Sequence, residues 1–385
     1  MRVKATAGEN LQQMTARRRR HYVGPSLIYD LDRIGAAAQA LALIGKRTGV
    51  EFIGAAKALP FDGLLERACR AFDGFDVSNC AELARLAAWR HRAGKTGLFR
   101  YVAMSGPALT SGASKISQLA ERLTVNIESM AQLEQFDQLA RWGVATELGL
   151  RIGQPLYRNA GPPMTRFGFA EAEIDTIRSL ALHPRFGGFH CHIDGDQAEV
   201  SAHLRALERL VRMSAELGVD AGVYNLGGGF RGQTLEEITL LCAHARALVP
   251  SGIRIVFEPG GWLTAQGGYG FCRVLAMRYR PDLEATLVTV DLSRDAHCRW
   301  SSLQLMGWWG PLPLTRRLLF FGPTAYEGDY LGTFEWTGAQ TAKVSDRDKG
   351  FVLFSGVTGY AASFNADFNG IGQARVVTIG DMGAV

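Results

Sequence analysis

The chain has 385 residues, more than a single hydrophobic core usually holds, so its length predicts two domains. Hydrophobic residues make up 47% of the sequence and charged residues 21%, which is typical of a globular enzyme and excludes a disordered or fibrous chain. A net charge of +5 suits an anionic ligand but is too small to call for nucleic acid, and no apolar run approaches the ~18 residues of a membrane span.

The N-terminal segment has polar and charged residues but no apolar core of a signal peptide. Its one basic run, Arg17 to Arg20, is interpreted as a solvated arm, because nucleic-acid binding needs a wider basic face. The six cysteines are scattered without a CxxC pair and predict neither a zinc site nor a disulfide framework. We therefore expect a cytoplasmic protein without a metal, whose thiols are reduced.

From about residue 35 to residue 260, short apolar runs alternate with longer helix-like stretches. The eight runs begin near Val50, Gly74, Leu98, Leu123, Glu147, Gly188, Ala221 and Ile253. The clearest helix-like stretches cover residues 82–92, 130–142, 198–217 and 234–248. Eight strand–helix units in succession predict a (β/α)₈ barrel, and strands that are apolar on both faces suit a sheet covered by helices.

After about Tyr269 the pattern changes to apolar stretches separated by Gly, Pro and Asp turns, without a long amphipathic helix. This pattern predicts a mostly-β C-terminal domain, joined by the N-terminal residues before the first helix. The expected boundaries are residues 35–265 for the α/β barrel, and residues 1–34 with 266–385 for the β domain.

Chemistry in such barrels sits where the strands end. Lys57 follows the first run, in the small and apolar setting Ala55-Ala56-Lys57-Ala58. A partly buried lysine has a lowered pKa, and its amine becomes nucleophilic enough to form a Schiff base. The alternative is a surface lysine on a loop.

After the sixth run, alternation places His190 and His192 on the same side of the strand. Two histidines at this spacing could bind a metal, but no third ligand is evident nearby. A flat imidazole packed on a cofactor ring and a hydrogen-bonded core histidine are the other interpretations.

The last two strands are followed by glycines. Gly227, Gly228 and Gly229 can adopt positive φ and form an anion nest, in the loop where barrels usually bind phosphate. Glu258 precedes Gly260 and Gly261 after the eighth run, and an ionised glutamate there could keep a pyridine nitrogen protonated. A lysine, a flat histidine, a glycine nest and an acid at one barrel mouth are what pyridoxal 5'-phosphate (PLP) requires.

With these residues in place, the sequence resembles the alanine-racemase-like (fold type III) PLP-dependent decarboxylases, which include ornithine, diaminopimelate and carboxynorspermidine decarboxylases. The resemblance runs from about Pro25 to Gly370. Its motifs are Ala56-Lys57-Ala58; Gly74-Phe75-Asp76-Val77 with Ala81-Glu82-Leu83; His190-Cys191-His192-Ile193; Asn225 to Phe230; Glu258-Pro259-Gly260; Asp291-Leu292-Ser293 with His297; Gly322-Pro323-Thr324 with Gly328-Asp329; and Tyr360 with Phe368-Asn369-Gly370. The last third looks most like the carboxynorspermidine decarboxylases.

The resemblance implies roles for individual residues. Lys57 would form the Schiff base with PLP, His192 would stack on the pyridine ring and Glu258 would pair with its nitrogen. The phosphate would be held by Gly227, Gly228, Gly229, Gly260, Gly261 and Tyr360. Asp329 would face the substrate from the second subunit of a homodimer whose subunits share their active sites.

Two positions depart from the family pattern. Gly261 stands where the family commonly has Arg or Glu after its EPG motif, and Ala325 stands in place of the cysteine that is implied to control protonation after CO₂ leaves. Tyr326 and Glu327 beside it are also unusual and indicate an altered substrate.

The sequence thus predicts PLP-dependent decarboxylation of a small amino-acid substrate, a diamino acid or derivative from a polyamine or secondary-metabolite pathway. Racemisation on the same barrel, a catalytically inactive regulator of the same fold and a phosphate-using barrel enzyme without PLP are the alternatives. No nucleic-acid or membrane partner is expected.

Overall fold

The computed structural model describes residues 10–95, 97–111, 119–141, 146–154, 165–193, 200–310, 313, 315–336 and 350–380, together with the backbone of residues 3–4. Contacts divide the chain into two units. One consists of Met1–Ala37 with Leu263–Val385, and the other of Ala38–Trp262. The boundaries expected from sequence fall within helix α2 (Leu31–Thr48) and at the end of helix α9 (Gly260–Ala265), and they stay predictions.

The unit Ala38–Trp262 contains a parallel sheet that closes on itself. Its strands are β3 (Glu51–Phe52), β4 (Gly54–Ala55), β5 (Gly74–Val77), β6 (Phe99–Ser105), β7 (Ala120–Ile127), β8 (Thr146–Arg151), β9 (Phe186–His190), β10 (Val223–Asn225) and β11 (Arg254–Phe257). The segment 51–55 meets both edges of the sheet, because β3 pairs with β11 and β4 pairs with β5. All eight predicted runs contribute to this barrel, so the predicted fold class is confirmed.

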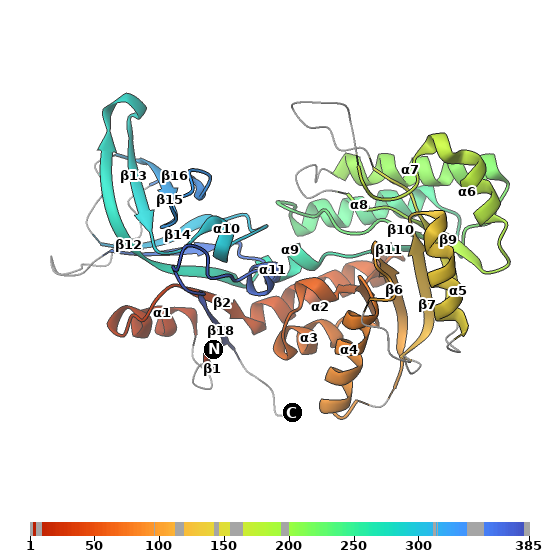
Figure 1. Cartoon of the computed structure of the whole chain (residues 1–385), viewed down its shortest axis with the longest axis horizontal. Helices are drawn as coiled ribbons and strands as arrows, with labels where there is room; N and C mark the ends of the chain where they lie inside the picture. Colours follow the sequence, from red (N-terminus) through yellow and green to blue (C-terminus); the bar gives the residue numbers. More distant parts are fainter. Residues whose placement is uncertain are drawn as a thin grey trace. The chain divides into compact units, whose positions relative to one another are not determined.

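Helices cover the outside of the barrel, as Figure 1 shows. They include α3 (Asp62–Cys69), α4 (Cys80–Arg92), α5 (Leu133–Arg141), α6 (Ile174–Ala181), α7 (Val200–Leu217) and α8 (Leu235–Leu248). Helix α7 buries positions 203, 206, 207, 210, 213, 214 and 217, the spacing of one helical face. Helix α8 begins with a capping box, in which Thr234 accepts from the Glu237 N–H and Glu237 accepts from the Thr234 N–H.

The other unit is mostly β, as predicted. Its strands are β1 (Val3–Lys4), β2 (Ser26–Asp30), β12 (Gly268–Arg280), β13 (Ala285–Val290), β14 (Gln304–Trp309), β15 (Arg317–Phe321), β16 (Tyr330–Glu335), β17 (Phe351–Ser355) and β18 (Arg375–Ile379). Strand β2 lies between β18 and β12, so N-terminal residues complete the C-terminal sheet. The short helices α10 (Arg294–His297) and α11 (Gly359–Ser363) belong to the same unit.

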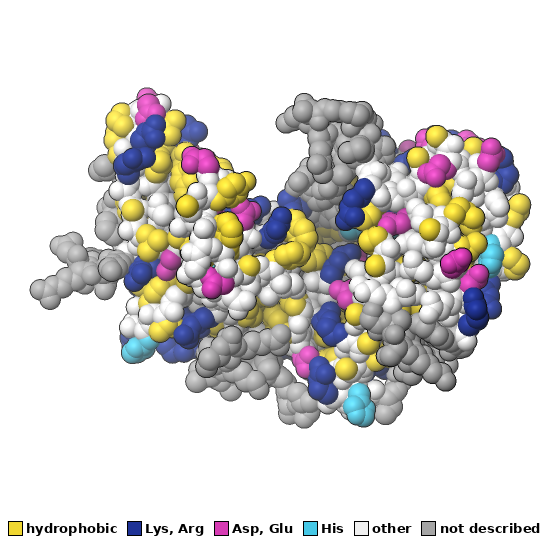
Figure 2. Space-filling model, viewed as in Figure 1, with side chains coloured by type: hydrophobic (Ala, Val, Ile, Leu, Met, Phe, Trp, Pro, Cys, Tyr) yellow, Lys and Arg dark blue, Asp and Glu magenta, His cyan; other side chains and the backbone are white. Residues whose placement is uncertain are grey.

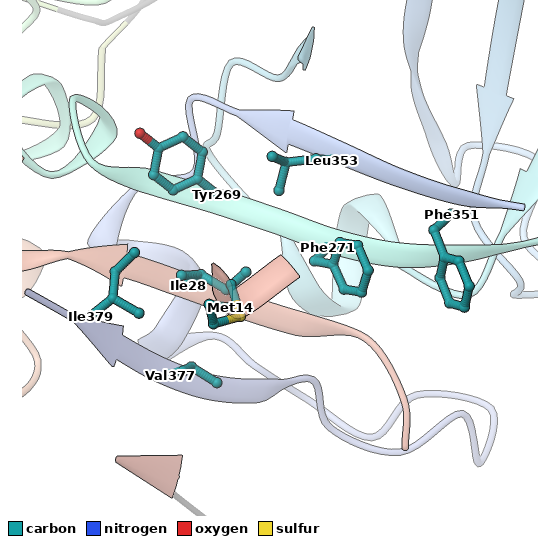
Figure 3. Packing of buried hydrophobic residues seen from close by; sticks show 8 residues of the cluster. All are labelled: Met14, Ile28, Tyr269, Phe271, Phe351, Leu353, Val377 and Ile379. Carbon is teal, nitrogen blue, oxygen red and sulfur yellow. The ribbon is translucent and has the colours of Figure 1, made fainter. Parts of the chain in front are cut away.

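The core of this unit is shown in Figure 3. Buried side chains from α1 (Leu11–Arg20), β2, β12, β17 and β18 meet there: Met14, Ile28, Tyr269, Phe271, Phe351, Leu353, Val377 and Ile379. The rings of Phe271 and Phe351 are stacked with an interplanar angle of 8°. This core joins residues from both ends of the chain. The sequence pattern that predicts the unit is therefore divided between its N-terminal and C-terminal parts.

The interpretation of Arg17 to Arg20 as a solvated arm holds for Arg17 and Arg20, which are exposed, but not for the segment as a whole. These residues form the last turn of α1, which begins at a capping box between Asn10 and Gln13. Arg18 is buried, and the Arg19 guanidinium lies 5.1 Å from the centre of the Trp309 ring. On the face drawn in Figure 2, cationic and anionic side chains are interspersed rather than gathered in one basic surface.

No helix among the described residues has the length and apolar character needed to cross a membrane. No cluster of three or more His, Cys, Asp or Glu side chains among them is arranged to hold a metal ion.

Candidate active site

Lys57 lies in a single 3₁₀ turn, η1 (Ala56–Ala58), directly after β4. Its Nζ atom is 3.3 Å from Oδ2 of Asp76, near the end of β5. The two strands are parallel neighbours with Ala55 opposite Asp76, so their carboxyl ends lie together. The Lys57 side chain is 35% exposed and the Asp76 side chain is fully buried. The second carboxylate oxygen of Asp76 has no hydrogen-bond partner among the described residues.

Arg85, on α4, holds the turn that carries Lys57. Its guanidinium donates to the Ala56 carbonyl at 2.6 Å and to the Leu59 carbonyl at 2.8 Å. These two carbonyls lie on either side of Lys57, and helix α4 follows the strand that carries Asp76. One strand–helix unit therefore supplies both the ionic partner of Lys57 and the clamp on its backbone.

Glu258 follows β11 and is only 4% exposed. The Asn225 side-chain N–H at the end of β10 donates to Glu258 Oε1 at 2.8 Å, and Asn225 Oδ1 accepts from the Gly227 N–H at 2.9 Å. Burial, reinforced by the nearby Asp76 carboxylate, raises the pKa of Glu258 to about 8, although Lys57 opposes the shift. The lysine and both acids therefore share one electrostatic environment.

The two histidines occupy different settings. His190 ends β9, is buried, and places Nε2 at 3.8 Å from Glu258 Oε1, while neither ring nitrogen forms a hydrogen bond within the described residues. The side chain of His192 is partly exposed, and its Nδ1 accepts from the Gly228 N–H at 3.2 Å. Although part of the residue reaches the surface, protein atoms surround its imidazole, and this desolvation, then the nearby Lys57 charge, hold the pKa of His192 well below its usual range. His192 is therefore a neutral, flat imidazole beside the glycine loop.

The loop Gly227–Gly228–Gly229 requires glycine. Gly227 has φ of +62° and Gly229 has φ of +93°. A Cβ at Gly227 would lie 2.6 Å from His192 Nδ1, and a Cβ at Gly229 would lie 2.6 Å from the Ile193 carbonyl oxygen. The Gly227 and Gly228 N–H groups already donate to Asn225 and His192. The N–H of Gly229 meets no acceptor in the part of the chain that is described, and this residue is partly exposed.

The two glycines after Glu258 begin helix α9. The Gly260 N–H approaches the Glu258 carbonyl at 2.8 Å, so the chain turns sharply directly after the acid. Gly260 is buried and Gly261 is partly exposed.

Two predicted site residues lie in the other unit. Tyr360 is on α11, and its ring meets Trp300 edge-on at 5.6 Å. Asp329 is 1% exposed. Its carboxylate accepts hydrogen bonds from the Ser293 hydroxyl (3.0 Å), the Arg294 N–H (2.6 Å) and the Thr324 hydroxyl (2.7 Å). This geometry anchors the loop that ends at Asp329.

The tip of that loop is the segment 325–328, in which Ala325, Tyr326 and Glu327 are all exposed. Tyr326 is 57% exposed. The three residues that depart from the family pattern therefore lie at the surface of this unit, close in sequence to the buried Asp329.

Sequence reasoning did not assign a role to several residues at the barrel mouth. Asp76 and Arg151 are charged residues at the ends of apolar strands, and Arg151 pairs with Glu128 at 3.2 Å while only 12% exposed. A charge inside a strand that is otherwise apolar on both faces was the available signal. Arg85 and His203 lie on helices and carry no such signal.

The arrangement fits PLP. The Gly229 N–H and the tight glycine loop suit a phosphate, the His192 imidazole suits a ring face, and a buried carboxylate suits a pyridinium nitrogen. An amine beside a buried carboxylate suits the aldehyde. These features come from the ends of strands β4, β5, β9, β10 and β11 of one barrel.

The comparisons with known proteins agree with this fit. The family described as "Pyridoxal-dependent decarboxylase, pyridoxal binding domain" matches residues 49–265. Diaminopimelate decarboxylase of Pseudomonas aeruginosa is 28% identical over 379 residues, covering 92% of this chain and 87% of that protein.

Two solved structures share the fold. Arginine decarboxylase of the Paramecium bursaria Chlorella virus has a TM-score of 0.71 at 16% identity, covering 96% of this chain and 99% of that chain. Carboxynorspermidine decarboxylase of Campylobacter jejuni has a TM-score of 0.62 at 19% identity, covering 92% and 93%.

Proposed function

Because the chain belongs to the pyridoxal-dependent decarboxylase family, we propose that Lys57, His192, Glu258 and the glycine loop form its cofactor site. The protein is a PLP-dependent carboxy-lyase, so the reaction class and cofactor predicted from the sequence are confirmed. The three relatives described above are decarboxylases, and the comparisons give no support to racemisation. The paired Lys57 also argues against an inactive regulator.

PLP, when bound, delocalises the electron pair that stays on the substrate's α-carbon as CO₂ departs. Lys57 supplies the amine that holds the cofactor's aldehyde carbon, and Asp76 holds that amine in place at 3.3 Å. Glu258 would pair with the pyridine nitrogen and share a proton with it, which its raised pKa favours. Asn225 orients the Glu258 carboxylate through the 2.8 Å hydrogen bond.

His192 would pack its neutral ring against the cofactor, and the Gly229 N–H would donate to the phosphate. Gly260 and Gly261 complete the proposed phosphate site, as the family resemblance implies, and a phosphate contact by Tyr360 of the other unit stays a prediction from the resemblance. One observation supports this proposal most strongly. Hydrogen bonds of Asn225 join Glu258 to Gly227, and Lys57 pairs with Asp76 in the same barrel.

We propose a diamino acid or a related derivative as the substrate, from a polyamine or secondary-metabolite pathway. The names of the relatives support this class, because diaminopimelate, arginine and carboxynorspermidine all carry nitrogen beyond the α-amino group. The loss of the family cysteine at Ala325 supports a substrate that differs from theirs.

We also propose a homodimer with shared active sites, in the cytoplasm. The dimer is implied by the family resemblance, and all six cysteines are free thiols, which suits a reducing compartment. For Asp329 we propose a structural role. Its buried, hydrogen-bonded carboxylate anchors the loop 322–329. Contact between Asp329 and the substrate stays a prediction.

The experiment that tests the function is incubation of the purified holoenzyme with a panel of amino acids, with CO₂ release and optical activity followed together. We expect CO₂ from at least one diamino acid or derivative, and none from the Lys57→Ala variant. Loss of optical activity without CO₂ would overturn the decarboxylase proposal in favour of a racemase. Sedimentation of the holoenzyme as a monomer at assay concentration would overturn the shared-site dimer.

A further inference from the structure

His203 is a completely buried histidine that none of the proposed catalytic steps uses. It lies on the inner face of α7, with its ring 4.9 Å from the Phe230 ring and 6.1 Å from the Phe257 ring. Its Nε2 atom is 2.8 Å from the Gly228 carbonyl oxygen. A carbonyl can only accept, so Nε2 carries a hydrogen and donates it.

Gly228 is held from its other side by the second histidine. Its N–H donates to His192 Nδ1 at 3.2 Å, so Nδ1 is an acceptor and the neutral His192 ring carries its proton on Nε2. A Cβ at Gly228 would lie 3.0 Å from the Glu258 carbonyl oxygen and 3.1 Å from His192 Cε1, so a side chain here would be tight against both. Gly228 therefore links His203 on the helix to His192 at the mouth of the barrel.

The carbonyl that His203 holds belongs to the peptide group between Gly228 and Gly229. The N–H of the same peptide group is the Gly229 donor that meets no acceptor within the described chain. A hydrogen bond to a peptide carbonyl polarises the group and makes its N–H a stronger donor, particularly where water is excluded. It also fixes the orientation of a peptide that three successive glycines would otherwise leave free to turn.

We infer that His203 is a positioning residue for anion binding: from α7 it fixes and polarises the Gly228–Gly229 peptide, whose N–H binds the phosphate of the cofactor. The inference rests on the proposed function, because that proposal assigns the phosphate to this loop. It adds a residue outside the loop whose side chain would set the affinity for the phosphate rather than for the pyridine ring.

The test compares variants that keep or remove the donor. His203→Gln places an amide N–H near the position of the histidine Nε2, whereas His203→Leu fills a similar volume without a donor. His244→Leu, on the exposed side of α8, is the control for replacing a histidine by leucine. Apoprotein of each variant is titrated with PLP and with pyridoxal, which lacks the phosphate, and ³¹P NMR of bound PLP reports on the phosphate directly.

We expect His203→Leu to weaken PLP binding by about tenfold or more while pyridoxal affinity changes by less than about twofold, because the loss concerns one hydrogen-bonded peptide. His203→Gln should recover most of the PLP affinity and the ³¹P chemical shift, and His244→Leu should match the wild type. If His203→Leu does not fold, His203→Asn, whose shorter amide withdraws the donor, carries the comparison with His203→Gln. Equal PLP and pyridoxal losses would overturn the inference.

Gly229→Ala distinguishes a failure of this inference from a failure of the proposed phosphate site. If Gly229→Ala weakens PLP binding and the donor-free variants at position 203 do not, the phosphate loop stands and the role of His203 is refuted. If neither change affects PLP affinity, the assignment of the phosphate to this loop is wrong and the inference is refuted with it.

Discussion

Lys57 and Asp76 meet at 3.3 Å at the ends of two adjacent parallel strands, 19 positions apart in the sequence. The contact follows from the register of β4 and β5, which places Ala55 opposite Asp76 and brings the next turn over the carboxylate. Because Asp76 is fully buried and one of its oxygens has no partner among the described residues, its charge depends on Lys57 for compensation.

Asp76→Asn removes that charge while keeping the shape of the side chain. We expect the cofactor to stay on Lys57, with kcat lowered by ~10²-fold, because a neutral amide does not pair electrostatically with the protonated Lys57 nitrogen. The pH at which the visible absorbance of the holoenzyme changes should also fall. Asp73→Asn, outside the strand, is the control; unchanged absorbance and kcat in Asp76→Asn would refute the role of the pair.

Glu258 should give the apoprotein a distinctive dependence of stability on pH. Its pKa is about 8 in the folded chain and about 4.5 when unfolded, so between these values the folded chain holds a proton that the unfolded chain has lost. The contribution of Glu258 to the free energy of unfolding is full below pH 4.5 and declines towards pH 8, by up to ~1.4 kcal/mol per pH unit.

Residue 258 cannot titrate in Glu258→Gln. The free energy of unfolding of this variant should therefore increase relative to that of the wild type as the pH rises from 5 to 8. Urea unfolding of both apoproteins at each pH measures the difference, with Glu236→Gln at the exposed start of α8 as the control. Parallel stability curves for wild type and Glu258→Gln would show that burial does not raise this pKa.

Arg85 should matter for catalysis although it lies outside the site. Arg85→Met keeps most of the side-chain volume but loses both donors to the Ala56 and Leu59 carbonyls, which frees the turn around Lys57. We expect kcat to fall by ~10²-fold with little change in KM, since a small displacement of a reacting group is costly. The control is Arg92→Met, on the same helix as Arg85. It loses an exposed ion pair with Asp62 of α3 and should keep wild-type kcat.

Asp329→Asn tests the loop anchor. The variant loses charge-assisted hydrogen bonds from Ser293, Arg294 and Thr324, and the free energy of unfolding should fall by ~2–3 kcal/mol in urea titrations. Glu327→Gln, at the exposed tip, should change stability by less than ~0.5 kcal/mol. Unchanged stability of Asp329→Asn together with a raised KM would favour substrate contact instead.

Much of the barrel could be predicted because its strands are short apolar runs with lysine, histidine, glycine and acid after them. Lys57 and Glu258 could be named on this basis, since strand ends converge in every such barrel. Asp76 and Arg85 could not, because their importance depends on which neighbouring element reaches Lys57, and one sequence does not give the register.

The mostly-β unit was harder to read. Its core joins Met14 and Ile28 to residues more than 200 positions later, so no local pattern reveals that one face of α1 is buried. The substrate-facing role that the resemblance implies for Asp329 stays a prediction, whereas the burial of its carboxylate depends on local packing that the sequence does not give, with the Thr324 and Ser293 hydroxyls donating to it.

Borohydride reduction of the holoenzyme followed by peptide mapping shows which lysine carries the cofactor, and we expect it to be Lys57. Reduction fixes PLP to the amine that holds it, so the mass of a phosphopyridoxyl group should appear on the single peptide containing Lys57, and the yellow colour of the native protein should disappear. The label should be absent from Lys57→Ala prepared in the same way. A label on any other lysine, or no label on a protein that releases CO₂ from an amino acid, would show that Lys57 does not hold the cofactor.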